Sequence, residues 1–527
     1  WVGLLLGLVV TFSVAWALGA RTGKLSGHYL PLCTIAWGLS LYLLVGSMEF
    51  LGGQTGITGV PALVIGGFSL ASPRAMGVVI WIVLLVAMWL MGNLLDSREG
   101  RAIRSLKGGQ IMAESMGVNT ALYRTKLFVL AALLATISGW LYAHMQRFVS
   151  PAPFNLNLGI EYLFMVVVGG AGHLWGAVLG ATVITLLKEK LQDILPMLCG
   201  TSGNFEMIVF GLLMVIVLQR FANGLWPTLQ RLTARWIAQP VQHLPPADPS
   251  LLDQRAIPEH GETLLAATHV SRRFGGLVAN NEVTMDLRAG EVHALIGPNG
   301  AGKSTFFNLI SGVDVPTSGE VRFMGRVMVD APSRRYAQLG LARTFQHVRI
   351  LGERTVLENV ALGAHQRAHS GWLKSMLRLD RAEESALLAQ ARVQIERCGL
   401  GALADQPAAS LALGQQRIVE IARALASQPA VLLLDEPAAG LRHLEKQALT
   451  ELLRQLRAQG LGILVVEHDM GFVMNLADRV TVLEFGSVIA SGTPAEIQGN
   501  QRVLQAYLGV DEDEDEDIAL QSAEVSA

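Results

Sequence analysis

Residues 297–305 read GPNGAGKST and match the G-x-x-x-x-G-K-[ST] pattern of a phosphate-binding loop. The apolar run 292–296 before this loop predicts a buried strand, and residues 306–310 after it predict a helix. This setting suits phosphate, because glycines let backbone N–H groups turn inward and a helix N-terminus adds positive potential. The sequence therefore predicts an α/β domain that binds a nucleoside triphosphate.

The side chains of this loop have separate roles toward a nucleotide. Lys303 supplies a point charge to the β- and γ-phosphates, and the hydroxyl of Ser304 would ligate Mg²⁺. The residues expected to contact the nucleotide are Gly297, Asn299, Gly300, Gly302, Lys303, Ser304 and Thr305.

Two further apolar runs end in groups suited to hydrolysis. Residues 431–434 predict a buried parallel strand that leads into Asp435 and Glu436. We expect Asp435 to hold Mg²⁺ and Glu436 to polarise the attacking water as a general base. Residues 463–466 predict another buried strand, after which His468 would reach the γ-phosphate.

The apolar residues are concentrated in the first half of the chain. Overall 51% of the 527 residues are hydrophobic and 16% are charged. Long apolar runs precede about residue 226, and a membrane-spanning helix needs ~20 such residues. A hydrophobic soluble core is the alternative, which five such runs in one half argue against. The candidate spans are residues 1–20, 29–46, 75–95, 127–144 and 205–218.

A sixth apolar stretch, residues 161–187, is interrupted by glycines between residues 169 and 176. Residues 96–126 carry many basic side chains, so the positive-inside rule places them in the cytoplasm. The nucleotide-binding half is also expected in the cytoplasm. The chain must therefore cross the membrane an even number of times between residues 96–126 and that half. The stretch 161–187 should therefore form two short limbs or a re-entrant hairpin. Its glycines would line a pathway or allow close helix packing, and both alternatives stay open.

The termini and the cysteines carry less information. The chain begins at Trp1, so we expect the natural start and additional helices upstream; the first run has no basic segment before it that would favour a secretory signal. Residues 511–517 are all acidic and predict a solvated, disordered tail. Cys33, Cys199 and Cys398 lie far apart and predict neither a disulfide framework nor a metal site.

Residues 264–509 resemble the ATPase of ABC transporters. In that family Phe274 would stack on adenine, and Gln346 would lie in the loop that contacts Mg²⁺ and couples to the membrane domain. The segment 411–417 resembles the signature, whose Ala412, Gly414 and Gln415 would close over the ATP of the opposite subunit. Residues 437–442 fall at the place of the D-loop.

The chain departs from the family pattern at two positions that act across the dimer. Ala412 stands where the signature usually has Ser, and Arg442 stands where the D-loop usually has Asp or Asn. One hydroxyl donor to the partner's γ-phosphate is therefore absent, although backbone N–H groups around Gly414 would still donate. A regulatory subunit with a weak catalytic site is one hypothesis; the intact Lys303, Asp435, Glu436 and His468 favour an active ATPase.

Longer strings resemble the importers of branched-chain amino acids. The ATPase half shares residues 340–346, 434–441, 466–470 and 506–509 with their ATPase. The first half shares residues 26–30, 113–119, 139–144 and 169–180 with their permease, including the short cytoplasmic segment before Gly117 that would dock on the ATPase. The resemblance thus implies a fusion of two subunits that are usually separate chains.

The expected organisation is an all-α polytopic membrane domain followed by an α/β P-loop ATPase domain. Residues 1–227 would be the permease, 228–260 a proline-rich linker, 261–510 the ABC ATPase and 511–527 the acidic tail. The resemblance implies ATP and Mg²⁺ as cofactors. Its implied partners are a second permease, a second ATPase, a periplasmic substrate-binding protein and the lipid bilayer, with no nucleic acid. The location would be the bacterial inner membrane, with the ATPase in the cytoplasm.

The substrate follows from the resemblance and not from any residue that binds it. Leucine, isoleucine and valine are the first expectation, and urea, short amides or aromatic acids are the second. A different class is an exporter, or a membrane-anchored ABC ATPase that does not import. The short segment before Gly117 favours import, because it resembles the coupling loop of importers.

Overall fold

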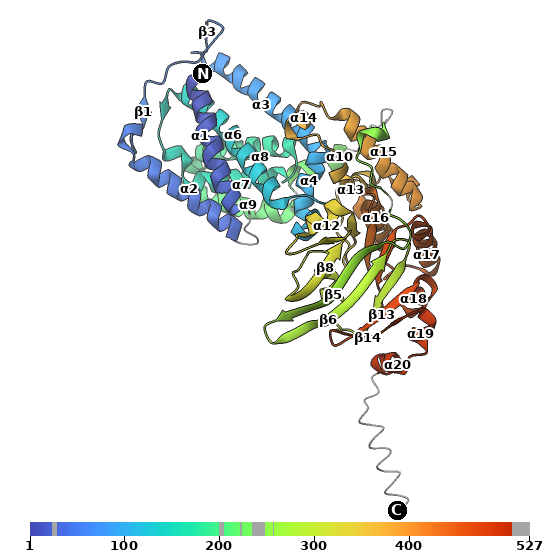
Figure 1. Cartoon of the computed structure of the whole chain (residues 1–527). Helices are drawn as coiled ribbons and strands as arrows, with labels where there is room; N and C mark the ends of the chain where they lie inside the picture. The colour runs from blue at the N-terminus through green and yellow to red at the C-terminus, as the bar shows by residue number, and fades with distance from the viewer. Residues whose placement is uncertain (24–28, 200–204, 222–223, 234–247, 257, 509–527) are drawn as a thin grey trace, which may run out of the picture. The chain divides into compact units, whose positions relative to one another are not determined.

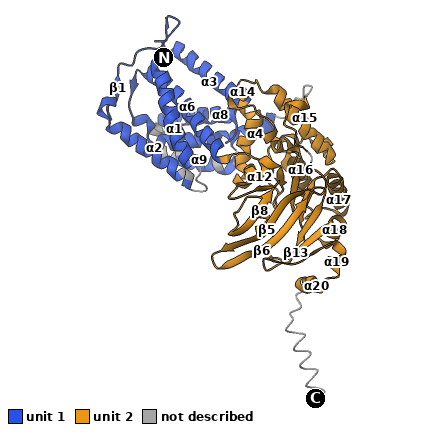
Figure 2. Ribbon diagram, in the orientation of Figure 1, with its two compact units in different colours: residues 1–93, 121–243 blue, residues 94–120, 244–527 orange. Residues whose placement is uncertain are grey.

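The computed structural model describes residues 1–23, 29–199, 205–221, 224–233, 248–256 and 258–508. The expected acidic tail lies outside these residues. The chain divides into two compact units (Figure 2): residues 1–93 with 121–243, and residues 94–120 with 244–527. The cytoplasmic loop of the first half therefore belongs to the same compact unit as the ATPase half.

The first unit consists mainly of apolar helices (Figure 1), and each of the six apolar stretches that we singled out is helical. Three helices are long and apolar enough to cross a membrane among the residues described, namely α1, α3 and α6, and the bent pair α7–α8 is a fourth candidate. The helices of this half are α1 (Val2–Thr22), α2 (Tyr29–Ser47), α3 (Pro73–Leu95), α6 (Thr120–Gln146), α7 (Leu156–Gly169), α8 (Leu174–Cys199), α9 (Phe205–Arg220) and α10 (Leu225–Thr233).

The predicted break in the sixth stretch is confirmed. Helices α7 and α8 are bent by 119° at their junction, where Gly170 and Gly172 adopt positive φ angles. The two helices also pack closely: a Cβ at Gly180 would lie 1.8 Å from the carbonyl oxygen of Met165. The glycines therefore serve close helix packing, one of the two alternatives, while a role in a transport pathway stays a prediction.

The second unit contains two sheets. A six-stranded sheet has the order β10-β11-β12-β7-β13-β14, and a four-stranded antiparallel sheet has the order β6-β5-β8-β9. The strands are β5 (Thr263–Phe274), β6 (Leu277–Arg288), β7 (Val292–Ile296), β8 (Ser318–Phe323), β9 (Arg326–Val327), β10 (Leu341–Arg343), β11 (Val431–Asp435), β12 (Gly462–Val466), β13 (Arg479–Glu484) and β14 (Ser487–Gly492).

Helices surround these sheets and also form a separate group. The helices α13, α15 and α16 share their own hydrophobic core, distinct from the cores formed by the sheets. The helices of this unit are α4 (Arg98–Ser105), α5 (Gln110–Ser115), α11 (Lys303–Ile310), α12 (Ser333–Leu339), α13 (Val356–Gly363), α14 (Trp372–Met376), α15 (Arg381–Arg397), α16 (Leu413–Ala426), α17 (His443–Ala458), α18 (Met470–Leu476), α19 (Pro494–Gln498) and α20 (Gln501–Leu508).

The expected linker is ordered at both of its ends, and for its first part, residues 229–237, the sequence itself favours a solvated helix. Residues 228–233 complete α10, because no proline lies between Pro227 and Pro240 to interrupt the helix. At the other end, Pro249–Leu251 forms a short 3₁₀ turn and Leu252 is buried in the core of α13, α15 and α16. Both ends of the expected extended segment are thus ordered parts of the fold.

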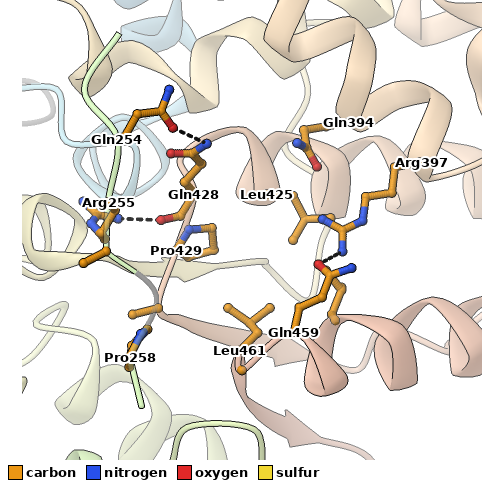
Figure 3. Close-up of a pocket in the computed structure, with 14 residues that line it drawn as sticks. Gln254, Arg255, Pro258, Gln394, Arg397, Leu425, Gln428, Pro429, Gln459 and Leu461 are labelled. Carbon is orange, nitrogen blue, oxygen red and sulfur yellow. Dashed lines mark hydrogen bonds between the residues drawn. The ribbon is translucent and has the colours of Figure 1, made fainter. Parts of the chain in front are cut away.

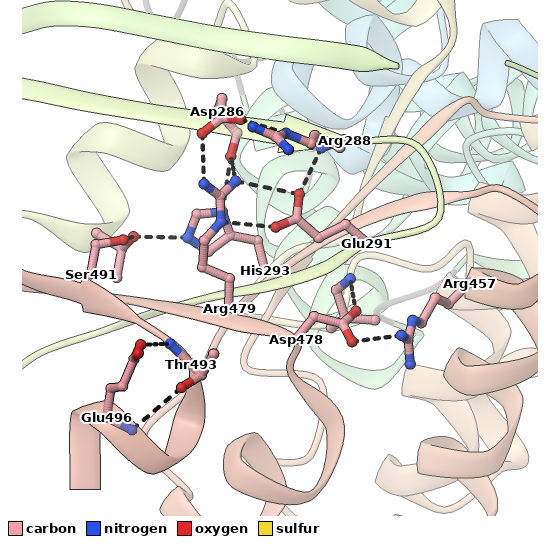
Figure 4. Close-up of polar contacts among 12 residues, drawn as sticks. Asp286, Arg288, Glu291, His293, Arg457, Asp478, Arg479, Ser491, Thr493 and Glu496 are labelled. Atoms are coloured by element: carbon pink, nitrogen blue, oxygen red, sulfur yellow. Dashed lines mark hydrogen bonds and ion pairs between the residues drawn. The ribbon is translucent and has the colours of Figure 1, made fainter. Parts of the chain in front are cut away.

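A buried histidine joins the two sheets (Figure 4). His293 of β7 is 1% exposed, with Nδ1 2.9 Å from the carbonyl oxygen of Asp286 and Nε2 2.8 Å from the hydroxyl of Thr481. Arg479 forms ion pairs of 2.8 Å with both Asp286 and Glu291 beside it. Burial, and secondly the charge of Arg479, lowers the pKa of His293 from 6.5 to about 4. The carbonyl requires an N–H at Nδ1, and the lowered pKa makes the neutral ring the form present at neutral pH.

We predict that His293 makes the ATPase unit sensitive to acid. The folded state binds fewer protons than the unfolded state between pH 6.5 and about 4, so stability is present above this window and is lost as the pH falls through it. The loss between pH 7 and pH 5 is about 2 kcal/mol. His293→Gln should reduce the fall of the melting temperature over this range, measured by thermal denaturation.

The matched control is His443→Gln, which replaces an exposed histidine of α17. It should leave the pH dependence of the melting temperature as in the wild type. An equal pH dependence in wild type and His293→Gln would contradict the prediction.

Candidate nucleotide site

Three neighbouring parallel strands bring the predicted site residues together. In the ladder β11-β12-β7, Asp435 pairs with Val466, and Val466 pairs with Leu295. The carboxyl ends of these strands therefore meet at one edge of the sheet. Asp435 and Glu436, His468, and the phosphate-binding loop follow these ends directly, so one edge collects all three motifs.

The phosphate-binding loop requires glycine at two closely packed positions. Gly297 has φ +151°, and a Cβ there would lie 2.1 Å from the carbonyl oxygen of Leu483. Gly302 has φ +93°, and a Cβ there would lie 2.3 Å from the carbonyl oxygen of Ala279. Helix α11 begins directly afterwards, at Lys303, as the motif predicts. The backbone N–H groups of its first turn are thus available to an anion.

Lys303 folds back over this loop. Its Nζ donates to the carbonyl oxygens of Gly297 at 2.7 Å and Pro298 at 2.9 Å. Burial lowers the pKa of Lys303, and the charges of Glu436 and Asp435 act against that shift. The ammonium group is therefore within electrostatic range of both carboxylates, close to where phosphates would be bound.

Asp435 is a buried carboxylate, 8% exposed, at the end of β11. Burial raises its pKa, Arg343 opposes this shift, and the neighbouring Glu436 adds to it. A cation would relieve both burial and repulsion. Ser304 and Gln346 are exposed and add a hydroxyl and an amide oxygen, which are hard ligands suited to Mg²⁺. Within the described part of the chain, clusters of three or more His, Cys, Asp or Glu that could hold a metal are absent, so phosphate oxygens would have to complete the coordination.

Glu436 has an unusual backbone conformation, with φ +47°. Its carboxylate Oε1 lies 3.8 Å from Nδ1 of His468, whose ring is largely exposed. His468 Nδ1 is equally distant from Glu467, a buried carboxylate that accepts the N–H groups of Ala438 and His468. Glu467 thus fixes the backbone on both sides of the predicted catalytic pair.

Arg417 is a contact of this site that the sequence did not single out. Its Nη1 donates to the carbonyl oxygen of Glu436 at 2.6 Å, and its Nη2 donates to the carbonyl oxygen of Gln346 at 3.4 Å. One side chain of α16 therefore ties together the predicted base and the glutamine loop. Arg417 is the last residue of the signature segment, and nothing in the pattern of that segment reveals these two partners.

The predicted adenine contact lies at the end of β5. Phe274 is 46% exposed, and the guanidinium carbon of Arg272 lies 4.6 Å from its ring centroid. The exposed ring is suited to stacking on a nucleobase. That role stays a prediction.

The signature segment forms the start of α16. Ala412 and Leu413 are exposed, and the Ala412 N–H donates to Oε1 of Gln415 at 3.2 Å. Gly414 is buried, and a Cβ there would lie 2.9 Å from Leu441. The segment thus presents an exposed helix N-terminus without the usual serine hydroxyl. Its role toward a second ATPase stays a prediction.

The short helix of the cytoplasmic loop packs next to the glutamine loop. Met112 and Met116 are buried in one cluster with Phe345 and Leu362. Phe345 directly precedes Gln346, and Leu362 lies in α13. Gly117, with φ +80°, ends the segment, and a side chain there would collide with Gln366.

Three family models match separate parts of the chain. A family model described as "Branched-chain amino acid transport system / permease component" matches residues 1–218, and an ABC transporter model matches residues 280–439. A model described as "Branched-chain amino acid ATP-binding cassette transporter" matches residues 487–513.

Individual relatives cover the second half. The chain is 44% identical over 251 residues to the high-affinity branched-chain amino acid transport ATP-binding protein LivG of Salmonella typhimurium, which covers 47% of this chain and 98% of LivG. It is 38% identical over 249 residues to BraF of Pseudomonas aeruginosa, with the same coverage. The crystal structure of the ADP conformation of MJ1267, an ATP-binding cassette, is 30% identical over 47% of this chain and 99% of its own, with a TM-score of 0.43.

The chain is thus an ABC transporter component in which an apolar helical permease domain precedes an ABC ATPase domain. It belongs to the family of branched-chain amino acid ABC transporters, as a permease–ATPase fusion. ATP binding and ATP hydrolysis coupled to transport follow from this membership, as does a membrane protein whose ATPase domain is cytoplasmic.

We predict that Arg417→Gln lowers the turnover of ATP hydrolysis about tenfold to a hundredfold while KM for ATP changes little. The arginine contacts backbone carbonyls of the predicted base and the glutamine loop, so its loss misplaces catalytic groups without removing a predicted phosphate contact. Steady-state phosphate release in membranes measures both constants. Arg502→Gln, an exposed position on α20, is the control; a turnover equal to this control would contradict the prediction.

Proposed function

We propose that this chain imports branched-chain amino acids across a bacterial inner membrane, driven by ATP hydrolysis, as one permease and one ATPase of a larger importer. The observation that carries the proposal is the joining of a permease half of this transport family to an ATPase half similar to LivG and BraF. The docking of the cytoplasmic helix α5 beside Gln346, within one compact unit, supports transport over a passive membrane anchor.

Each predicted site residue has a place in the proposed cycle. Lys303 and the first turn of α11 bind the phosphates, and Phe274 stacks on the base. Glu436 takes a proton from the attacking water, and His468 contacts the γ-phosphate and responds to its loss. Asp435, Ser304 and Gln346 would hold Mg²⁺, which neutralises charge on the phosphate oxygens when bound.

The proposed assembly contains a second permease, a second ATPase and a periplasmic substrate-binding protein. The exposed signature segment would close over the nucleotide of the second ATPase. The absent hydroxyl at Ala412 and the basic Arg442 weaken that site relative to the site of this chain, which favours a heteromer with two unlike ATPases. The permease half of the chain, residues 1–227, would cross the membrane several times.

A second contact links the cytoplasmic loop to the ATPase half. Arg101 of α4 forms a double contact with Glu384 of α15, with Nη2 3.0 Å from Oε2, and both side chains are buried. Arg98 donates its backbone N–H to Glu384 at 3.0 Å and its Nη1 to the carbonyl oxygen of His365 at 2.9 Å. The loop is thus held to the helical group by a charged anchor in addition to the methionines of α5, which suits transmission of movement.

We predict that Glu436→Gln abolishes uptake of labelled leucine by cells carrying this chain and its partner subunits. The amide cannot take a proton from water, while the predicted phosphate contacts of the site remain. Binding of a fluorescent ATP analogue should therefore persist, whereas Lys303→Ala should lose it. Glu451→Gln, which replaces an exposed glutamate of α17, serves as the control and should transport normally.

Two outcomes would count against this proposal. Uptake that persists in Glu436→Gln would contradict the role of Glu436. Wild-type cells that hydrolyse ATP but take up no leucine would contradict the substrate, and urea, short amides and aromatic acids would then be tested.

We predict that Arg101→Glu uncouples hydrolysis from uptake, because it places two like charges in a buried contact. Breaking such a pair costs roughly 3–5 kcal/mol. The reversed pair Arg101→Glu with Glu384→Arg should recover part of the uptake measured per ATP hydrolysed. A double variant no better than the single variant would contradict a direct pairing in the working transporter.

A further inference from the structure

Residues 252–256 of the linker form a strap on the ATPase unit. Leu252 is 3% exposed and lies in the core of α13, α15 and α16. The N–H of Asp253 donates to the carbonyl oxygen of Arg367 at 2.9 Å, and Nε of Arg367 donates back to the carbonyl oxygen of Asp253 at 3.0 Å. This reciprocal pair fixes the backbone of the strap against η5 (His365–Arg367), the turn that follows α13.

Arg255, near the other end of the strap, binds the segment after α16 and the end of α12 (Figure 3). Its Nη1 donates to the carbonyl oxygen of Gln428 at 2.9 Å, after α16, and its Nη2 donates to the carbonyl oxygen of Gln338 at 3.1 Å, in α12. Gln254 accepts a hydrogen bond of 3.1 Å from Gln428. Burial lowers the pKa of Arg255, yet its carbonyl partners are neutral. The guanidinium therefore serves to hold backbone segments together and not to balance a negative charge.

The strap thereby joins two hydrophobic cores. Leu252 belongs to the core of α13, α15 and α16, whereas α12 packs through Tyr336 into the core of the two sheets. Gly340, which ends α12 with φ +111°, has no room for a side chain because one would lie 2.9 Å from the Arg255 guanidinium. Arg255 thus both donates a hydrogen bond to the end of α12 and packs closely against Gly340.

The strap also borders the seat of the cytoplasmic helix α5. A cavity of about 380 Å³ is lined by Ser115 and Met116 of the loop, by strap residues 253–256, and by Gln366 and Gln338. A second cavity of about 300 Å³ lies against strap residues 254–256 and is lined by Gln394, Arg397 and Leu461 among others (Figure 3). The strap thus borders both cavities, and the first of them reaches α5.

We propose that this strap is a coupling element: Arg255 holds the end of α12 and the segment after α16 together, and Asp253 holds the turn after α13, so that α5 has a rigid seat. In this view Arg255 is a positioning residue and the fusion linker does more than connect two domains. The LivG relative aligns over 251 residues, which are 47% of this chain. The coupling part of this inference rests on the proposed transport function; the holding part does not.

Arg255→Gln tests the proposal in the full chain, with Arg326→Gln as the control because Arg326 is an exposed arginine of the same unit. Hydrogen exchange measured by mass spectrometry should rise about tenfold for residues 333–340 and 427–430 in Arg255→Gln alone, because these are the segments that Arg255 contacts. ATP hydrolysis in membranes should stay within about twofold of wild type, while leucine uptake per ATP hydrolysed should fall several-fold.

The outcomes separate the alternatives. Exchange equal to the control would overturn the strap as a holding element, whether or not leucine is the substrate. Increased exchange with uptake and hydrolysis reduced in parallel would overturn the coupling role, because general loss of structure produces that pattern.

A second variant does not disturb the fold of the ATPase. A specific protease site inserted between residues 234 and 247 allows the linker to be cut while the strap stays with the ATPase half. Uptake per ATP hydrolysed should then fall much less than in Arg255→Gln. An equal fall would show that the linker acts only as a tether.

Discussion

The parallel pairing of β11, β12 and β7 is the constraint on which the nucleotide site depends. Each strand is buried along its whole length, so its register is set by core packing and not by the site. Because the three strands run in the same direction, their carboxyl ends form one edge of the sheet. The pairing of the strands therefore sets the positions of the polar groups at that edge. The loop and His468 are separated by the 162 residues 306–467, and the ladder alone is enough to bring them together.

The parts that could be predicted from the sequence are those with a local physical cause. Buried parallel strands appear as continuous apolar runs, so β7, β11 and β12 were found within one residue of their ends. The conformation of the phosphate-binding loop could be predicted from its glycines, because only glycine tolerates the φ angles and backbone contacts found at Gly297 and Gly302. The bend between α7 and α8 followed from charge placement and an even number of crossings.

The parts that could not be predicted are contacts between residues far apart in the sequence. Arg101 and Glu384 are 283 residues apart, and Arg367 meets Asp253 across 114 residues. A lone arginine or glutamate in a polar segment has many possible partners, and only the assembled helices select one. Arg417 is similar, because its partners are backbone carbonyls that any sequence would supply. The order in the last part of the linker was not predicted either, because its prolines favour an extended segment and the core that buries Leu252 is formed by residues far away in the sequence.

The contacts of the cytoplasmic loop have a different role in a fused chain than between separate subunits. Covalent linkage raises the effective concentration of two domains, so their contacts need not supply the affinity that separate subunits require. A buried ion pair such as Arg101–Glu384 contributes little net stability, because desolvation offsets most of the attraction. Its geometry nevertheless admits one arrangement of α4 on α15. We infer that this pair selects the orientation of the loop, while the linker and its strap keep that loop and its seat together.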